Sequence, residues 1–324
     1  MLAVLLGAVL LVYEGVRRVL PDSSKPDASP HGPAIQVVIP TGVSAGDIGG
    51  ILEEEGVISD GGRFREYAKE QGEGSEFKAG TYRFRAGIDY DVIIARLDAG
   101  PQVPKLVKLL IPEGLRVSEV VDRVASDTNI SKSSYNAAVQ RSKPPADFGS
   151  PPSMEGFLFP ATYDVKPRQT AAGLVKAQLA AFQANFDQVD MSYAESKNLN
   201  KYDVLIIASM IEREARVDEE RPLVAAVMYN RLRIDMQLGI DATLLYEQGS
   251  WSHELTVSEL EADTPYNTRV RFGLPPTPIC NPGLKSLQAA ASPANVDYLY
   301  YVAKGDSGRH YFTDNFEDFK AHGG

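Results

Sequence analysis

The stretch Val204-Leu-Ile-Ile-Ala-Ser-Met-Ile211 decides how the C-terminal half of this chain folds, and Glu212, Arg213 and Glu214 follow it directly. A helix that is apolar around most of its circumference is buried on most of its sides. Carboxyls at the end of such a helix are poorly solvated, and poor solvation raises the pKa of a carboxyl. An acid that is still protonated near neutral pH can donate its proton to a leaving oxygen. The stretch therefore predicts a buried helix over 201–216 that carries a candidate acid–base group.

A purely structural role explains the same acids. Arg216 lies four residues after Glu212 and Arg213 adjoins both acids, so an ion pair at the helix end would give the same pattern. Helical geometry does not choose between Glu212 and Glu214, because each lies over residues of the preceding turn. From spacing alone, both acids remain candidates.

The regions that flank this helix predict an α+β fold. Helical patterns over 170–186 and 220–233 surround it, and the chain then changes to loops and short strands that end in strand 298–302. The aromatic and β-branched residues of that strand predict that it is buried. Helices and strands are segregated rather than alternated, which favours α+β over a doubly wound sheet.

An internal repeat occupies the N-terminal half. Ile39-Pro-Thr-Gly42 recurs as Ile111-Pro-Glu-Gly114, an offset of 72 residues (39 to 111). Each copy predicts a strand, a Pro/Gly turn, an amphipathic helix and a second helix capped by serine. The first copy continues with a predicted strand over 79–84 and a helix over 90–97. The repeat is either an old duplication that serves stability or a small module that binds or positions carbohydrate.

Shifts in composition predict the domain boundaries. Residues 21–33 are rich in Pro, Ser and Asp and predict an extended linker, and the four prolines within 144–153 mark a second boundary. The predicted organisation is a membrane anchor over 1–20, a linker over 21–34, a repeated region over 35–153 and a third region over 154–324 that carries the candidate acids.

The first residues predict a membrane segment. Leu2 to Tyr13 is an uninterrupted apolar run, whereas a spanning helix needs about 20 residues. A helix that extends to Leu20, or a true start upstream of Met1, would complete a single anchor. A cleaved signal peptide is the alternative, although basic residues before the run and a cleavage site after it are missing. Arg17 and Arg18 do not reveal the orientation, because they lie on the wrong side for an exported C-terminus.

Composition and missing motifs exclude several classes of protein. The formal net charge is −10 and no stretch concentrates Lys and Arg, which argues against a nucleic-acid partner. Cys280 is the only cysteine, and the four histidines show no metal-ligand spacing. Serine-hydrolase, zinc-peptidase, phosphate-loop and dinucleotide-binding motifs do not occur. We therefore expect neither a metal nor an organic cofactor.

The end of the apolar helix resembles a known signature. Ala208-Ser-Met-Ile-Glu-Arg-Glu214 is similar to the signature helix of the YceG-like endolytic murein transglycosylases, often called MltG. The repeated part resembles the LysM-like module of that family, and the N-terminal helix resembles its membrane anchor. Further segments occur in the order found in the family and together cover about residues 35–316, namely Glu155–Pro160, Thr162–Tyr163, Tyr229–Leu232, Tyr266–Thr268, Gly273–Pro276, Ile279, Asn281–Gly283 and Tyr298–Ala303.

The resemblance assigns roles to particular residues. It implies that Glu212, the first acid of the signature, is catalytic and that Glu214 is a supporting or structural residue. It also implies that polar residues near the site line a substrate groove, with Asp241 and Thr243 matching the Asp-x-Thr segment of the family and Tyr229, Asn230, Tyr266 and Asn267 matching further polar positions. Helix caps or loop hydrogen bonds explain these polar residues equally well.

The sequence departs from the family pattern in two places. Gly239 and Ile240 replace polar residues, often Gln and then Ser or Thr, before the Asp-x-Thr segment, and Ala242 replaces a proline. In the tail, Phe319 and Lys320 stand where the family has a His-Asn pair. Sugar contacts that relatives make at these positions are in doubt here. Neither change touches the expected catalytic acid.

The resemblance implies a lytic transglycosylase, a lyase that cleaves the MurNAc–GlcNAc bond of peptidoglycan glycan strands and leaves an anhydro-muramic end. It implies a single-pass anchor in the cell membrane, an extracytoplasmic catalytic part and work beside peptidoglycan synthases in cell-wall assembly. Two alternatives remain open. One is a lysozyme-type muramidase that pairs Glu212 with Asp241 or Glu214. The other is a non-catalytic scaffold that binds peptidoglycan.

Overall fold

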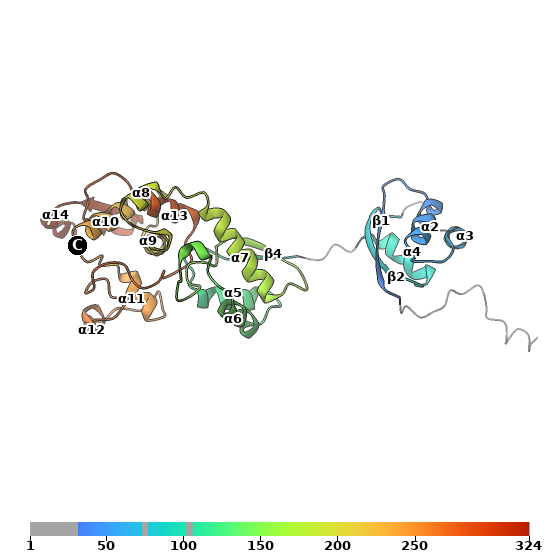
Figure 1. Ribbon diagram of the computed structural model, residues 1–324, viewed down its shortest axis with the longest axis horizontal. Helices are drawn as coiled ribbons and strands as arrows, with labels where there is room; N and C mark the ends of the chain where they lie inside the picture. The colour runs from blue at the N-terminus through green and yellow to red at the C-terminus, as the bar shows by residue number, and fades with distance from the viewer. Residues whose placement is uncertain (1–31, 73–76, 102–105, 324) are drawn as a thin grey trace, which may run out of the picture. The chain divides into compact units, whose positions relative to one another are not determined.

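The computed structural model describes residues 32–72, 77–101 and 106–323, which form two compact units (Figure 1). The first unit contains the described residues up to 101, and the second contains those from 106 onward. The expected membrane anchor and most of the expected linker lie outside the described residues. Within these ranges, none of the helices is both long and apolar enough to cross a membrane.

The first unit is a two-stranded antiparallel sheet packed against helices. Its strands pair so that Ile39 lies opposite Gly80. Alternate strand residues such as Val37 and Phe84 turn inward to a core of aliphatic and aromatic side chains. In chain order the elements are β1 (Ala34–Ile39), α2 (Ala45–Glu54), α3 (Gly61–Glu70), β2 (Gly80–Arg85) and α4 (Tyr90–Ala99).

The second unit is mainly helical, with two small antiparallel sheets. It begins with β3 (Val107–Leu110), α5 (Val117–Asp127), α6 (Lys132–Arg141), η1 (Ala146–Phe148), β4 (Thr162–Val165) and α7 (Ala171–Phe186). It continues with α8 (Ser192–Ser196), α9 (Lys201–Glu214), η2 (Asp218–Glu220), α10 (Arg221–Arg233), α11 (Asp241–Glu247) and α12 (Val257–Glu261). It ends with α13 (Leu284–Ala291), β5 (Tyr300–Ala303), η3 (Gly305–Ser307), β6 (His310–Thr313) and α14 (Phe316–Ala321).

The repeat seen in the sequence is present in the structure. The start of α5 at Val117 lies 72 residues after the start of α2 at Ala45. At corresponding positions, the carboxylate of Asp47 accepts the backbone N–H of Ser44, and that of Glu119 accepts the backbone N–H of Arg116. In each copy two helices follow the first strand, and the strand that closes the copy is antiparallel to it.

The second copy of the repeat shares one hydrophobic core with the rest of the second unit. Phe148 and Met154, from the proline-rich segment, are buried, and the ring centroids of Phe148 and Phe186 are 4.7 Å apart. The boundary expected between 153 and 154 therefore falls inside a compact unit. The segment is a connection whose Phe148 packs against aromatic side chains of the shared core.

The apolar helix lies at the centre of the second unit. α9 packs against α10 and α13, and it also contacts α11 (Figure 1). The helices expected over 170–186, 201–216 and 220–233 are present as α7, α9 and α10, and the α+β class is confirmed. The expected burial of the last strand is only partial, because β5 belongs to a two-stranded sheet with β6 and most of its residues are half-buried.

Candidate functional site

The end of α9 brings two carboxyls out of the core. Asn200 caps the start of the helix by accepting the backbone N–H groups of Tyr202 and Asp203. Residues 204–211 are buried around the whole helix, and the helix ends at Glu214, before Ala215 turns to an extended backbone. Glu212 and Glu214 therefore stand at the boundary between the packed interior and the surface.

Glu212 is held by two donors. Its Oε1 is 3.2 Å from Nη1 of Arg221, and its Oε2 accepts the backbone N–H of Gly283 at 2.9 Å. The side chains of this ion pair are only 6% and 9% exposed. Arg221 also donates to Ser286 and Asp218. Both oxygens of Glu212 are thus engaged in a buried, charge-assisted network.

A third carboxyl, which the sequence analysis missed, lies beside Glu212. Glu113 stands in the turn that opens the second repeat copy, and a Cβ placed on Gly283 would lie 1.8 Å from its Oε1. Partial desolvation, and then the charge of Glu212, raise the pKa of Glu113. Its place in the Ile-Pro-x-Gly turn of the repeat was the signal available, but nothing in the turn indicated contact with Gly283.

Glu214 has different surroundings. Its Oε2 accepts the hydroxyl of Tyr301, from β5, at 2.9 Å. Burial raises the pKa of the Glu214 carboxyl, and the charge of Asp241 acts in the same direction. The hydrogen bond from Tyr301 and the charges of His310 and Arg213 oppose the shift. The residue keeps partial exposure to solvent.

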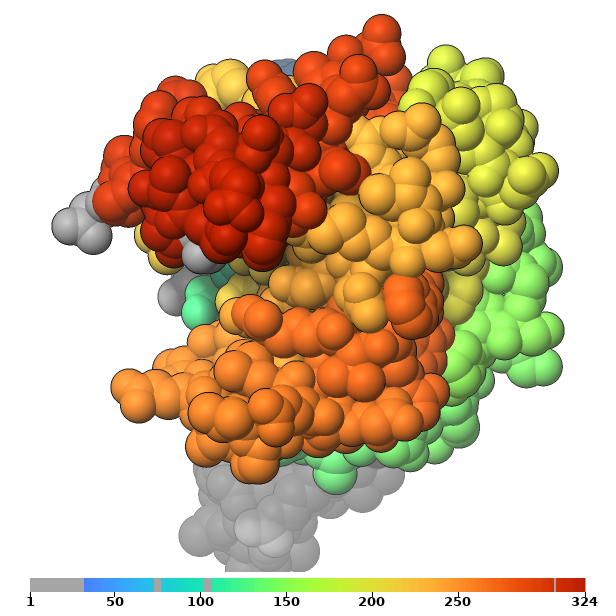
Figure 2. Space-filling model, turned by 90° about the vertical axis from the view of Figure 1, so that its left-hand side faces the viewer, coloured from blue at the N-terminus to red at the C-terminus, as the bar shows by residue number. Residues whose placement is uncertain are grey.

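A hollow in the surface runs between the two segments that flank Glu214. Figure 2 shows it between the C-terminal segment in red and the segment of α11 and α12 in orange. Tyr301 belongs to the sheet of the first segment, and Asp241 begins α11 in the second. Asp241 is itself paired with Arg269, with Nε and Oδ1 2.6 Å apart. The charge of Asp241 reaches the Glu214 carboxyl, so the two acids lie near each other.

Most of the other expected groove residues hold the fold together. Thr243 and Asn267 are fully buried, and neither side chain is open to a substrate. The Thr243 hydroxyl donates to the carbonyl of Ile240, and the Asn267 amide donates to the carbonyls of Leu260 and Ala262. The remaining polar groups also have partners, with Tyr229 on Ala290, Asn230 on Val296 and Tyr298, and Tyr266 on Thr277.

The departures from the family pattern lie beside these residues. Ile240 is buried, and its backbone N–H donates to the hydroxyl of Thr268 at 2.9 Å. Gly239 has a φ of +63°, a conformation that favours glycine over other residues. Its backbone N–H donates to the carbonyl of Thr268. This segment is fixed by its main chain rather than by polar side chains.

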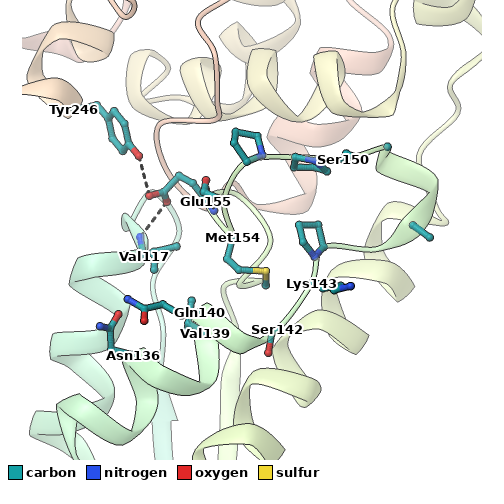
Figure 3. A pocket seen from close by; sticks show the side chains of 16 residues that line it. Val117, Asn136, Val139, Gln140, Ser142, Lys143, Ser150, Met154, Glu155 and Tyr246 are labelled. Atoms are coloured by element: carbon teal, nitrogen blue, oxygen red, sulfur yellow. Dashed lines mark hydrogen bonds between the residues drawn. The ribbon is translucent and has the colours of Figure 1, made fainter.

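A separate pocket of about 760 Å³ lies on the second repeat copy (Figure 3). At one end, Glu155 accepts the backbone N–H of Val117 at 3.0 Å and the hydroxyl of Tyr246 at 3.2 Å. Burial raises the pKa of Glu155 to about 7. In the sequence, Glu155 stands out only as the first residue of the segment Glu155–Pro160, which does not indicate a role for its carboxyl. Its two partners connect the start of α5 to α11.

Metal binding has no support in the part of the chain that is described, where no three His, Cys, Asp or Glu side chains are grouped to hold an ion. Cys280 is buried, and burial raises the pKa of its thiol, which disfavours the reactive thiolate. Acid–base chemistry by carboxyl groups is what these side chains can perform.

Fold and site together define an α+β protein that holds a protonatable carboxyl between two segments bordering a surface hollow. The sequence profile of the YceG-like family matches residues 37–323. The chain belongs to the YceG-like family.

Characterised relatives and a solved structure agree with this placement. The chain is 32% identical over 336 residues to an endolytic murein transglycosylase of Streptococcus pneumoniae serotype 2, covering 94% of this chain and 60% of that protein. It is 32% identical to an endolytic murein transglycosylase of Bacillus subtilis strain 168, covering 88% of this chain and 82% of the relative. The crystal structure of a putative yceG-like protein from Listeria monocytogenes aligns with a TM-score of 0.59 and 31% identity, over 90% of this chain and 99% of the other.

Proposed function

We propose that this protein is an endolytic lytic transglycosylase that cleaves the MurNAc–GlcNAc bond of peptidoglycan glycan strands and leaves an anhydro-muramic end. The observation that carries the proposal is Glu214, a carboxyl with a raised pKa whose partners Tyr301 and Asp241 come from the two segments that border the surface hollow. Relatives named endolytic murein transglycosylases support the substrate class, although the chain spans only 60% of the pneumococcal relative.

Glu214 is a better acid–base group than Glu212 in this geometry. A group that donates and then recovers a proton needs an oxygen that the substrate can reach. Both oxygens of Glu212 are occupied by Arg221 and Gly283 in a site that is 6% exposed. Glu214 has one hydrogen-bond donor among the described residues, Tyr301, which acts on Oε2 alone. The resemblance had favoured the first acid of the signature, and the contacts favour the second.

The reaction needs one carboxyl and no water. Protonated Glu214 donates its proton to the oxygen that joins C1 of MurNAc to GlcNAc, and the C1–O bond breaks. The Glu214 carboxylate then takes the proton of the C6 hydroxyl of the same muramic residue, whose oxygen bonds to C1 and closes the anhydro ring. Burial favours the protonated form for the first step, and the Tyr301 hydroxyl stabilises the carboxylate for the second.

The neighbouring acid does not supply the second carboxyl that hydrolysis requires. A hydrolysing glycosidase uses two carboxyls, and the second activates water or attacks the sugar. Asp241 acts on Glu214 through its charge, but its own Oδ1 is 2.6 Å from Nε of Arg269. This pairing supports a transglycosylase over a lysozyme-type muramidase.

The rest of the chain fits work at the cell envelope. The first unit, with its β-α-α-β core, is proposed as a LysM-like module that holds glycan. Residues 1–20 are proposed as a single-pass anchor in the cell membrane that keeps the catalytic part outside the cytoplasm. Peptidoglycan synthases are the proposed partners, because a cutting enzyme acts where new strands are made.

The mass of the product tests this function. Purified sacculi are digested with the protein, and the soluble fragments are weighed by mass spectrometry. A transglycosylase releases fragments with anhydro-muramic ends, which are one water lighter than the products of a muramidase. Fragments with reducing muramic ends would show a hydrolase instead. Binding to sacculi without any soluble fragment would show a scaffold.

A further inference from the structure

A buried histidine–carboxylate pair lies next to the Glu214 site. The carboxylate of Glu220 accepts the backbone N–H of His310 at 3.0 and 3.2 Å, and its Oε2 is 2.7 Å from Nδ1 of the same residue. The two side chains are only 13% and 7% exposed. Glu220 thus fixes both the main chain and the ring of His310. Because the carboxylate only accepts, Nδ1 of the ring is the donor of this contact.

The ring of His310 packs against the residue that contacts Glu214. Its centroid is 5.3 Å from that of Tyr301, with the ring planes at 83°. The two residues lie on neighbouring strands, where Ala303 is paired with His310 and Tyr301 with Phe312. The Tyr301 hydroxyl donates to Glu214 at 2.9 Å. A continuous set of contacts therefore runs from Glu220 through His310 and Tyr301 to Glu214.

We propose that the Glu220–His310 pair is a positioning device that holds the Tyr301 hydroxyl on the Glu214 carboxyl while protons move to and from it. The proposal rests on the assignment of Glu214 as the acid–base group. It gives Glu220 and His310 a part in the reaction without contact with substrate. Both lie outside the residues to which the sequence analysis assigned a role.

Other groups also act on the Glu214 carboxyl. They come from every element packed around it, namely Arg213 on α9, Arg231 on α10, Asp241 on α11, Tyr301 on β5 and His310 on β6. Among these groups, Tyr301 is the one that donates a hydrogen bond to Glu214. A hydrogen bond to the charged form lowers the pKa of a carboxyl, so its loss raises that pKa.

The remaining histidine–carboxylate pairs in the described part of the chain supply a contrast. His322 is 3.4 Å from Asp318 in α14, and these side chains are 43% and 38% exposed. Such a pair contributes little at the surface. His322→Gln is therefore a matched control, since it removes a histidine paired with an acid from the same C-terminal segment.

The test is the pH dependence of kcat/KM for the release of soluble glycan from sacculi. Because Glu214 must be protonated in the free enzyme, kcat/KM falls as the pH rises through its pKa. His310→Gln and Tyr301→Phe each move this fall to higher pH, by about one pH unit. The double variant moves it by less than the sum of the two single shifts, because the part of the His310 effect that acts through Tyr301 is already lost and only its direct charge effect remains. His322→Gln keeps the profile of the parent.

The outcomes separate this proposal from the proposed function. A direct charge effect of His310 would survive in the Tyr301→Phe background, so additive shifts overturn the positioning role. A His310→Gln profile equal to that of His322→Gln overturns it as well. If His310→Gln does not fold, Glu220→Gln serves as the same test, because it removes the carboxylate charge that contacts Nδ1 of the His310 ring. Parent-like activity of Glu214→Gln would instead overturn the acid–base assignment itself.

Discussion

The two acids at the end of α9 are two residues apart, yet they lie in different surroundings. Glu212 accepts hydrogen bonds from Arg221 and from the backbone N–H of Gly283. Glu214 instead accepts the Tyr301 hydroxyl, and burial raises its pKa. Two residues turn a helix by about 200°, so the two side chains leave it in nearly opposite directions. The partners of each carboxyl, and not its position in the motif, therefore decide which acid can exchange a proton.

Removal of the Glu212 charge is expected to lower the free energy of unfolding more than the other substitutions. Glu212→Gln leaves the buried Arg221 with only the half-exposed Asp218 as a counter-charge, which destabilises the fold by about 3–5 kcal/mol. Denaturant unfolding measures the loss. Glu219→Gln is the control, since Glu219 is 74% exposed and 3.8 Å from Arg309. Equal stability of the two variants would contradict a stabilising role of the buried Glu212–Arg221 ion pair.

Glu155 sharpens the comparison, because its side chain is buried like that of Glu212 but forms no ion pair with a cation among the described residues. Its pKa is raised to about 7 in the folded protein, against a usual value near 4.3 when unfolded. The folded state therefore binds a proton that the unfolded state has lost between these values, and stability falls as the pH rises through the window.

Replacement of this carboxyl removes the penalty. Glu155→Gln keeps an acceptor for Val117 and is expected to gain stability relative to the parent between pH 4.5 and 7, by roughly 3 kcal/mol. Unfolding of both proteins at several pH values measures the difference. A constant difference across the window would show that the Glu155 carboxyl is not held protonated.

The smallest expected effect tests the contact between Glu113 and Gly283. A Cβ at position 283 would lie 1.8 Å from Oε1 of Glu113, so this flexible side chain must move away. Gly283→Ala is expected to cost about 1 kcal/mol, and the cost is expected to vanish in a Glu113→Ala background. The double-mutant cycle, measured by thermal unfolding, would contradict the contact if the two effects were additive.

The sequence predicted the elements well because their signals are local. The apolar run of α9, the 72-residue repeat and the helices α7 and α10 all depend on spacing within one segment. The proline-rich segment 144–153 predicted a boundary but lies inside the second unit, since prolines occur both in linkers and in packed connections. Only the burial of Phe148 and Met154 separates the two cases.

The site was less predictable because its contacts are distant in the chain. Gly283 lies 71 residues from Glu212, and Tyr301 lies 87 residues from Glu214. No pattern within α9 indicates which acid each of them meets. The same holds for Thr243 and Asn267, whose polar side chains are characteristic of a groove but are buried in loop hydrogen bonds.

The rates of glycan cleavage by Glu214→Gln and Glu212→Gln, measured side by side below the unfolding temperature of both, test the central claim most directly. Loss of a general acid–base group lowers the rate by about 10²–10⁴-fold. The account predicts that loss for Glu214→Gln, with unchanged unfolding, and a far smaller loss for folded Glu212→Gln. A Glu214→Gln variant that cleaves like the parent, beside an inactive but folded Glu212→Gln, would contradict it.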